Sequence, residues 1–245
     1  MKPFALITGA SRGIGRSVAA ALASDGCNLI LTASGDEAGL ADTARLCRKI
    51  RNDIRIVMRL CDVGDSRAVS GLYDSLNALG IPGADILVNN AGIGRFELVQ
   101  DMTDEVWRRI IDVNLSGVFY MCRGALPYML HNHNGCIINI SSYWGISGAA
   151  MESAYSASKG GVNAFTLSLA SELAFSGIRV NALACEYIDT GMNAGFTDEE
   201  IEQVLLTMPS RRVISPDEVG QMVGKLAGSD ITGRILSMEE GLALI

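Results

Sequence analysis

The chain has 245 residues, a length that fits one α/β domain, and a formal net charge of −7 without any basic run. This charge excludes nucleic acid as an expected partner. Hydrophobic residues make up 49% and aromatic residues only 6%, which suits parallel strands buried on both faces. No apolar run is long enough to cross a membrane and the first residues resemble a strand, so we expect a cytoplasmic protein whose six cysteines are reduced thiols.

Short apolar segments alternate with helical patterns along the chain. We expect strands over residues 4–8, 28–32, 54–60, 86–89, 136–140, 179–183 and 235–238. The helices expected between them cover residues 13–24, 36–51, 66–79, 104–130, 153–176 and 216–227. This alternation predicts a single-domain Rossmann fold over residues 1–245, with a doubly wound parallel sheet of about seven strands and helices on both faces.

A glycine-rich loop follows the first expected strand and opens the first helix. Its candidate dinucleotide-binding residues are Gly9, Ser11, Arg12, Gly13, Ile14 and Gly15. Glycine permits a tight turn and a close approach of the backbone, and the N–H groups at the helix start can bind a pyrophosphate. The spacing Gly-x-x-x-Gly-x-Gly differs from the common fingerprint, but its position between a strand and a helix predicts a dinucleotide site.

The end of the second expected strand bears on which dinucleotide binds. An acidic residue there usually binds the ribose 2′-hydroxyl of NAD, whereas this chain has Ala33 followed by Ser34. Asp36 comes slightly later, and we expect it to start the next helix. Because Arg12 and Ser34 can donate hydrogen bonds to a 2′-phosphate, NADP(H) is favoured over NAD(H).

Further motifs, in register along the chain, resemble the classical short-chain dehydrogenase/reductase family. They are Asp62-Val63 after the third strand, Asn90-Ala91-Gly92 after the fourth, Asn114, Ser142, and Tyr155-Ser-Ala-Ser-Lys159. The resemblance is strongest to members of the 3-oxoacyl-acyl-carrier-protein reductase type. It implies a carbonyl reductase or alcohol dehydrogenase with the first two motifs at the cofactor and with Asn114, Ser142, Tyr155 and Lys159 as the catalytic set.

The chemistry of that set follows partly from its spacing. Tyr155 and Lys159 lie four residues apart, so they share one face of the expected helix. An ammonium nearby is expected to lower the pKa of the phenol, which then exchanges a proton with the substrate oxygen, while Ser142 donates a hydrogen bond to the same oxygen. The resemblance further implies that Lys159 holds the nicotinamide ribose and that Asn114 anchors the water of a proton relay.

The chain departs from the family after the sixth strand. The usual Pro-Gly pair is replaced by Cys185-Glu186, whereas Ile188 and Thr190 match residues expected near the carboxamide and the phosphates. Glu186 allows two interpretations. It faces the substrate and favours a cationic or hydrogen-bond-donating one, or it points to solvent and only reshapes the loop. We favour the second.

Residues 189–212 interrupt the alternation and form a candidate substrate lid. Within them Thr197 and Glu200 predict a capping box for a short helix. The substrate is expected to be a small-molecule or thioester carbonyl. Neither residues 131–135 nor residues 175–177 offer the fixed positive charges with which the resembled reductases hold an acidic carrier protein, and His131 and His133 are expected to be solvated rather than to bind a metal.

Three questions stay open at this stage. The stretch from Ser141 to Glu152 also resembles family members that reduce a ketone on a modified lysine of elongation factor P. A dinucleotide-sensing protein without turnover is a further alternative. Small residues on the Tyr155 helix suggest a homodimer or homotetramer, and residues 239–241 depart from the family's usual Asp-Gly-Gly near a subunit interface.

Overall fold

The computed structural model describes residues 2–188, 190 and 197–238. Within them seven parallel strands form one sheet in the order β3-β2-β1-β4-β5-β6-β7. The strands are β1 (Phe4–Ile7), β2 (Asn28–Ala33), β3 (Ile56–Leu60), β4 (Ile86–Asn89), β5 (Gly135–Ser142), β6 (Ile178–Cys185) and β7 (Arg234–Ser237). The predicted doubly wound parallel sheet is therefore confirmed.

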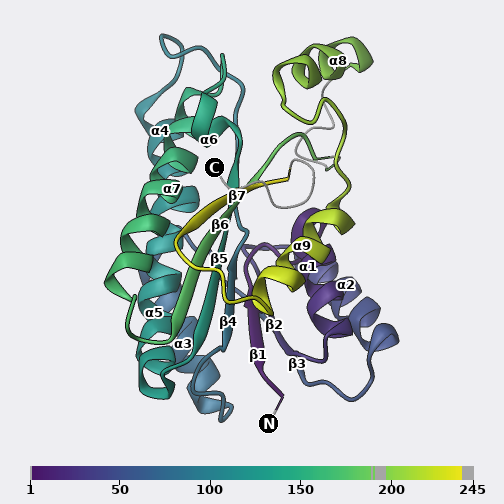
Figure 1. Cartoon of the computed structure of the whole chain (residues 1–245), viewed down its shortest axis with the longest axis vertical. Coiled ribbons are helices and arrows are strands. Elements are labelled where there is room, and N and C mark those ends of the chain that lie inside the picture. The colour runs from purple at the N-terminus through teal and green to yellow at the C-terminus, as the bar shows by residue number, and fades with distance from the viewer. Residues whose placement is uncertain (1, 189, 191–196, 239–245) are drawn as a thin grey trace.

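Helices cover both faces of this sheet (Figure 1). On one face lie α1 (Gly13–Ser24), α2 (Glu37–Ile50) and α9 (Pro216–Ala227). On the other lie α3 (Ser66–Ala78), α4 (Asp104–Ile111), α5 (Gly117–Asn132) and α7 (Ser153–Glu172). The short helix α6 (Trp144–Ser147) and the helix α8 (Asp198–Thr207) lie toward the carboxyl ends of the strands.

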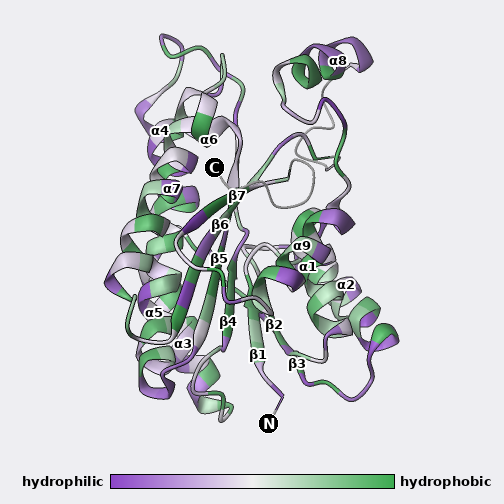
Figure 2. Ribbon diagram, in the orientation of Figure 1, coloured by the Kyte–Doolittle hydropathy of each residue, from purple (hydrophilic) through white to green (hydrophobic). Residues whose placement is uncertain are grey.

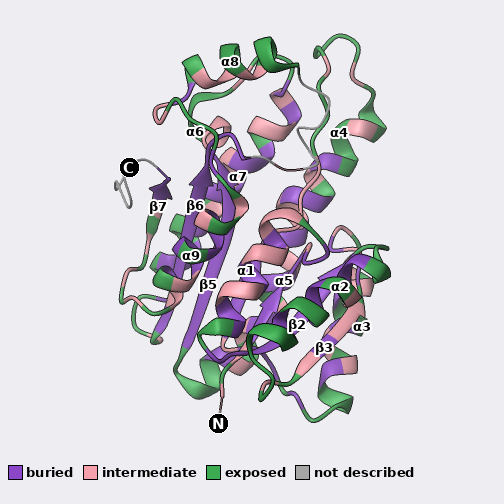
Figure 3. Ribbon diagram, turned by 90° about the vertical axis from the view of Figure 1, so that its right-hand side faces the viewer, coloured by how far each residue is buried: buried purple, intermediate pink, exposed green. Residues whose placement is uncertain are grey.

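The central strands are apolar because both of their faces are buried. In β2, Leu29 and Leu31 belong to the hydrophobic core on the α1, α2 and α9 side, whereas Ile30 belongs to the core on the opposite side. This alternation has the two-residue period of a strand. Figure 2 shows mostly hydrophobic residues in β1, β2 and β4, and Figure 3 shows β5 and β6 buried along their length. The sheet thus separates two hydrophobic cores, one on each of its faces.

Two expected helices differ from those observed, and one observed helix was not expected. The single helix predicted over residues 104–130 is divided into α4, a π-helical turn η1 (Asp112–Ser116) and α5. The extra residue of a π-turn shifts the helix face, and it does so here around Asn114. The helix α7 ends at Glu172 rather than residue 176, and α6 was not predicted because four residues carry no helical period.

The topology places a crevice beside β1. The chain leaves β1 toward β2 and β3 on one side and reaches β4 on the other, and ligands of such folds bind beyond the strand ends at this point. The helix α8 begins with the predicted capping box of Thr197 and Glu200. Residues 189 and 191–196 of the candidate lid, and residues 239–241, lie outside the described residues. No described helix combines the length and hydrophobicity that spanning a membrane requires.

Candidate active site

A cavity of about 530 Å³ opens at the carboxyl ends of the strands. Its wall contains every predicted cofactor residue except Gly15 and every predicted catalytic residue except Asn114. These wall residues are Gly9, Ser11, Arg12, Gly13, Ile14, Ser34, Asp62, Val63, Asn90, Ala91, Gly92, Ser142, Tyr155, Lys159, Ile188 and Thr190. The structure therefore brings together side chains that the sequence distributes over almost the whole chain.

Gly15 and Asn90 hold the glycine loop against β4. Gly9 has a φ of +64° and Gly13 a φ of +52°, a backbone region in which glycine is favoured. A Cβ on Gly15 would collide with the Gly9 carbonyl and lie 2.7 Å from Asn90 Nδ2. The same Nδ2 donates hydrogen bonds to the carbonyls of Thr8 (2.9 Å) and Gly9 (3.1 Å). Gly15 thus serves the cavity through close packing rather than by lining it.

The start of α1 differs from the start of most other helices. Asp36, Asp65, Thr103 and Ser215 each cap a following helix with a side-chain oxygen, whereas Arg12 at the same position of α1 makes no such bond. The first turn of α1 also carries no acidic residue. Its first backbone N–H groups, together with the positive end of the helix dipole, therefore suit an anion such as a pyrophosphate. This chemistry fits a dinucleotide.

Arg12, Ser34 and Asp36 line the part of the cavity that bears on the dinucleotide preference. Asp36 caps α2 rather than beginning it, and its Oδ1 accepts a hydrogen bond from Gly39 N at 2.9 Å. That bond, a second one with Ser11, and the charge of Arg12 keep the pKa of the Asp36 carboxyl below its usual range. One cation, Arg12, and one carboxylate, Asp36, thus line this part of the cavity.

Asp62 lies at the end of β3 with its carboxylate already occupied. Its Oδ2 forms an ion pair with Arg109 Nη2 at 2.8 Å, and its Oδ1 accepts a hydrogen bond from Gly64 N at 3.0 Å. The Arg109 charge is therefore paired with a carboxylate, whereas no ion pair is found for Arg12 among the described residues. Asp62 and Val63 form the wall of the cavity on the β3 side.

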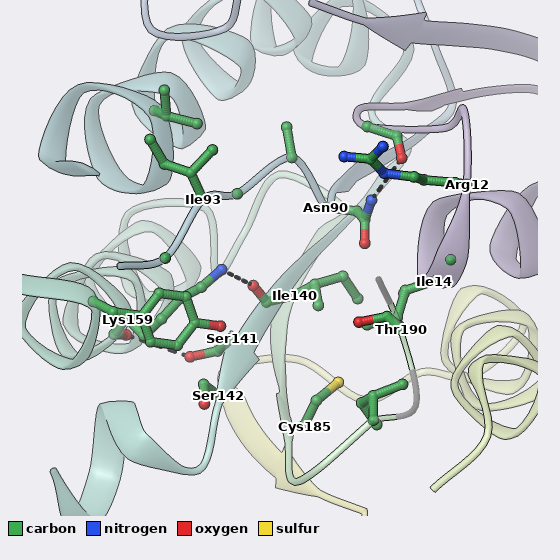
Figure 4. A pocket seen from close by; sticks show the side chains of 18 of the residues that line it. Arg12, Ile14, Asn90, Ile93, Ile140, Ser141, Ser142, Lys159, Cys185 and Thr190 are labelled. Atoms are coloured by element: carbon green, nitrogen blue, oxygen red, sulfur yellow. Dashed lines mark hydrogen bonds between the residues drawn. The ribbon is translucent and has the colours of Figure 1, made fainter. Parts of the chain in front are cut away.

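Tyr155 and Lys159 lie on the cavity side of α7, as predicted. Lys159 Nζ donates a hydrogen bond to the Ile140 carbonyl at 2.7 Å and lies 5.7 Å from the centre of the Tyr155 ring (Figure 4). Burial lowers the pKa of Lys159 to about 8. Its ammonium therefore gives up a proton more readily than that of an exposed lysine.

The expectation that Lys159 lowers the pKa of Tyr155 is wrong. Burial of the phenol raises this pKa above its ordinary value, and the nearby Glu152 and Cys185 raise it further. A hydrogen bond with the Ser142 side chain acts in the opposite direction but does not outweigh them. Tyr155 is thus a protonated phenol at neutral pH, the form that donates a proton.

Ser142 rather than Ser141 is the serine placed beside Tyr155. Ser142 ends β5, and its Oγ accepts a hydrogen bond from Trp144 N at 3.2 Å in addition to its bond with Tyr155. Ser141 Oγ instead donates to Asn163 Oδ1 at 2.6 Å. Because side chains alternate along a strand, only one of the two serines can face the phenol, and the structure selects the predicted one.

Asn114 is fully buried in the π-turn and does not line the cavity. Its Nδ2 donates to the Ile93 carbonyl at 2.8 Å and to Ser158 Oγ at 3.0 Å, and its Oδ1 accepts from Ile93 N at 2.8 Å. The side chain therefore fastens the loop after β4 to α7, and the proton relay stays a prediction.

Glu186 is buried, with 7% of its surface exposed, so the interpretation that it points to solvent is wrong. Its Oε2 accepts hydrogen bonds from Ser210 N at 3.0 Å and Ser210 Oγ at 2.6 Å. This carboxylate ties the end of β6 to the segment after α8. Beside it, burial raises the pKa of the Cys185 thiol to about 12, so this thiol stays protonated.

Phe96 and Trp144, whose side chains the sequence was expected to place around the substrate pocket, line the cavity, and so does Glu152, to which sequence reasoning gave no role. The Trp144 ring stands edge-on to Phe96 and to Tyr155, with ring centres 6.5 Å and 6.4 Å apart. Glu152 precedes α7, and its position three residues before Tyr155 was the available signal. Its burial could not be read from that spacing.

Comparisons with known proteins agree with this arrangement. The family model described as short chain dehydrogenase matches residues 3–201. The 3-oxoacyl-[acyl-carrier-protein] reductase FabG of Staphylococcus aureus strain Mu50 is 37% identical over 246 residues, covering 99% of this chain and 98% of the relative. The protein of the same name from Chlamydia muridarum is 34% identical, covering 98% and 96%.

A solved structure supports the same grouping. A protein described as a short-chain alcohol dehydrogenase from Sinorhizobium meliloti 1021 superposes with a TM-score of 0.88 at 37% identity, covering 97% of this chain and 95% of that one. The chain therefore belongs to the short-chain dehydrogenase family and is an oxidoreductase related to the FabG reductases.

Proposed function

We propose that the chain is a cytoplasmic, NADP(H)-dependent carbonyl reductase or alcohol dehydrogenase that acts on a ketone or thioester carbonyl. The observation that carries this proposal is the convergence of Tyr155, Ser142 and Lys159 on the cavity whose other end is the uncapped start of α1. When bound there, the nicotinamide would supply or accept a hydride. The side chains of the protein handle the proton and the oxygen of the substrate.

Tyr155 is the proposed general acid and base. Its raised pKa keeps the phenol protonated, so it can donate a hydrogen bond to the carbonyl oxygen and then a proton as charge develops there. Ser142 donates a second hydrogen bond to the same oxygen and holds it in place. Lys159, with a pKa of about 8, can exchange a proton near neutral pH and replace the one that Tyr155 loses. Asn114 positions the backbone beside Lys159.

The preference for NADP(H) rests on Arg12 and Ser34. The Arg12 guanidinium lines the cavity without an ion pair among the described residues, so it is available to a 2′-phosphate. Asp36 nearby already accepts hydrogen bonds from Gly39 N and Ser11, which leaves it less suited to a ribose hydroxyl. These contacts favour NADP(H), whereas Asp36 alone would favour NAD(H).

Self-association is part of the proposal. On α7, Ala157, Ala164 and Leu167 are exposed, and Phe119 on α5 is exposed in the same layer. Small residues beside two large apolar ones suit the approach of a second copy. Ala154 of the predicted small-residue stripe is instead buried within the chain. A homodimer through α5 and α7 is the simplest assembly, and a homotetramer would need a second surface.

The test is NADPH oxidation with a panel of ketones, measured for the wild type, Tyr155→Phe and the matched control Tyr128→Phe. We expect Tyr155→Phe to reduce kcat by about 10²–10⁴-fold because the proton donor is lost. Its NADPH affinity, measured by fluorescence titration, should stay unchanged. Retained turnover in Tyr155→Phe would refute the assignment of the acid. NADPH binding without turnover of any ketone or alcohol would instead support a dinucleotide-sensing protein.

A further inference from the structure

Glu152 stands out among the carboxylates that line the cavity. It precedes α7, and only 4% of its surface is exposed. Its Oε2 is buried and accepts no hydrogen bond, and no ion pair to Glu152 occurs within the described parts of the chain. Its backbone carbonyl accepts from Ser156 N at 2.7 Å, so the main chain is held while the carboxyl group is not.

An unpaired carboxyl group of this kind is costly to bury. Transfer of a carboxylate out of water is unfavourable unless a cation or hydrogen-bond donor replaces the lost water. Burial accordingly raises the pKa of Glu152 to about 7. The group also raises the pKa of Tyr155, which places its charge close to the reacting phenol. A ligand that supplies a positive charge would relieve both effects.

The other side chains at this end fit the same kind of ligand. Glu186 is a second buried carboxylate in the wall, and its Oε1 accepts no hydrogen bond among the described residues. The Lys159 ammonium lies 5.7 Å from the centre of the Tyr155 ring, and it already donates a hydrogen bond to the Ile140 carbonyl. Phe96 and Trp144 also line the cavity, and aromatic rings can attract ammonium groups.

We propose, on the basis of the function proposed above, that Glu152 selects substrates that carry a protonated amine beside the ketone. The Glu152 carboxylate forms a charged hydrogen bond with the ammonium, while Ser142 and Tyr155 hold the carbonyl oxygen. Glu186 adds negative charge on the β6 side of the same cavity. The substrate class is thus an amino-ketone on reduction and an amino-alcohol on oxidation. Glu152 determines specificity and takes no part in the proton transfer.

The test compares pairs of substrates that differ only at the amine. Aminoacetone is paired with hydroxyacetone, and longer amino-ketones with their hydroxy-ketones. For the wild type we expect kcat/KM to favour the amine by about tenfold or more, since a hydrogen bond between charged groups is stronger than one between neutral groups. Glu152→Gln should abolish this preference, lower kcat/KM for the amines only, and leave NADPH affinity unchanged. Glu152→Asp should retain part of the preference.

Glu172→Gln is the matched control, because it makes the same change at an exposed position at the other end of α7. It should retain the wild-type preference in full. An unchanged ratio in Glu152→Gln, or an equal loss for both members of each pair, would overturn the proposal. So would a wild type that shows no preference for the amine.

Equilibrium binding separates this proposal from the proposed function. Calorimetric titration of the enzyme with each ketone in the presence of NADP⁺, which has no hydride to give, measures amine preference without turnover. If no ketone is reduced, the proposed function fails, yet tighter amine binding that Glu152→Gln abolishes would still support the role of Glu152. Equal binding of amine and hydroxyl compounds would overturn it even in an active enzyme.

Discussion

The two ends of the cavity are built in different ways. At the end formed by the glycine loop and the start of α1, most of the contacts come from the backbone and side chains of consecutive residues, including Arg12. The end around Tyr155 combines Phe96, Glu152 and Glu186 from three distant segments, and two of these are buried carboxylates. Local backbone geometry therefore defines the first end, whereas long-range packing defines the second. This difference suggests a shared cofactor chemistry and a chain-specific substrate.

The largest effect is expected at the glycine loop. In Gly15→Ala the new methyl group would collide with the Gly9 carbonyl and crowd Asn90, so the loop must move away from its binding position. We expect NADPH affinity to fall by about 100-fold, or about 2.7 kcal/mol, in a fluorescence titration. Gly71→Ala, where a Cβ would meet no atom within 4 Å, is the control and should bind normally. Normal binding in Gly15→Ala would refute the close packing described here.

The free energy of unfolding tests the Glu152 carboxyl group at the substrate end of the cavity. The pKa of Glu152 rises from 4.5 in the unfolded chain to about 7 in the native protein. Between these values the native state keeps a proton that the unfolded chain has released, so raising the pH through this window destabilises the fold. Glu152→Gln should therefore increase the free energy of unfolding by about 2 kcal/mol above pH 7.

That gain should disappear as the pH falls to 4.5, where the carboxyl group is protonated in both states. Urea unfolding of the wild type and of Glu152→Gln, above pH 7 and at pH 4.5, measures this gain in the free energy of unfolding. A gain of the same size at both would show that it arises from packing and not from an unpaired carboxylate. The control Glu172→Gln should show no such pH dependence.

A substitution at Arg12 tests which part of the dinucleotide the cofactor end of the cavity recognises. Arg12→Gln keeps a hydrogen-bond donor but removes the charge, so NADPH affinity should fall about tenfold, or 1.4 kcal/mol, while NADH affinity stays the same. Arg48→Gln, at an exposed position on α2, should change neither. Equal losses for both dinucleotides would mean that Arg12 contacts the pyrophosphate rather than a 2′-phosphate.

The smallest effect is expected where Glu186 meets Ser210. Ser210→Ala removes the 2.6 Å hydrogen bond from the hydroxyl but keeps the bond from the backbone N–H. We expect a loss of about 1 kcal/mol in the free energy of unfolding and a change in ketone KM. NADPH affinity should be unaffected, because this contact belongs to the substrate end. A weaker NADPH affinity would show that the two ends are coupled.

The residues predicted for the cofactor end come together at one cavity, and the sequence could group them because most of the pattern is local. Gly13 and Arg12 follow β1 directly, and their place between a strand and a helix predicts their role. The orientation of Glu186 was beyond prediction, since it depends on Ser210 on the far side of α8. The role of Asn114 stays a prediction, and its π-turn, and hence its buried contacts, has no periodic signal in the sequence.

The pKa of Tyr155 shows the same limit. Its four-residue spacing to Lys159 predicted a lowered pKa, yet burial and the neighbouring Glu152 raise it. Spacing along a helix identifies neighbours but not how much water reaches them. The protonation of the side chains at the substrate end therefore depends on their burial, which only the structure shows.

The most direct test is a fluorescence titration of the purified protein with NADPH and, separately, NADH. A preference for NADPH of about tenfold or more is predicted, because Arg12 and the uncapped start of α1 remain intact despite the changed residues Cys185 and Glu186. A preference for NADH would contradict the role given to Arg12 and Ser34. Binding of neither dinucleotide would contradict the account as a whole.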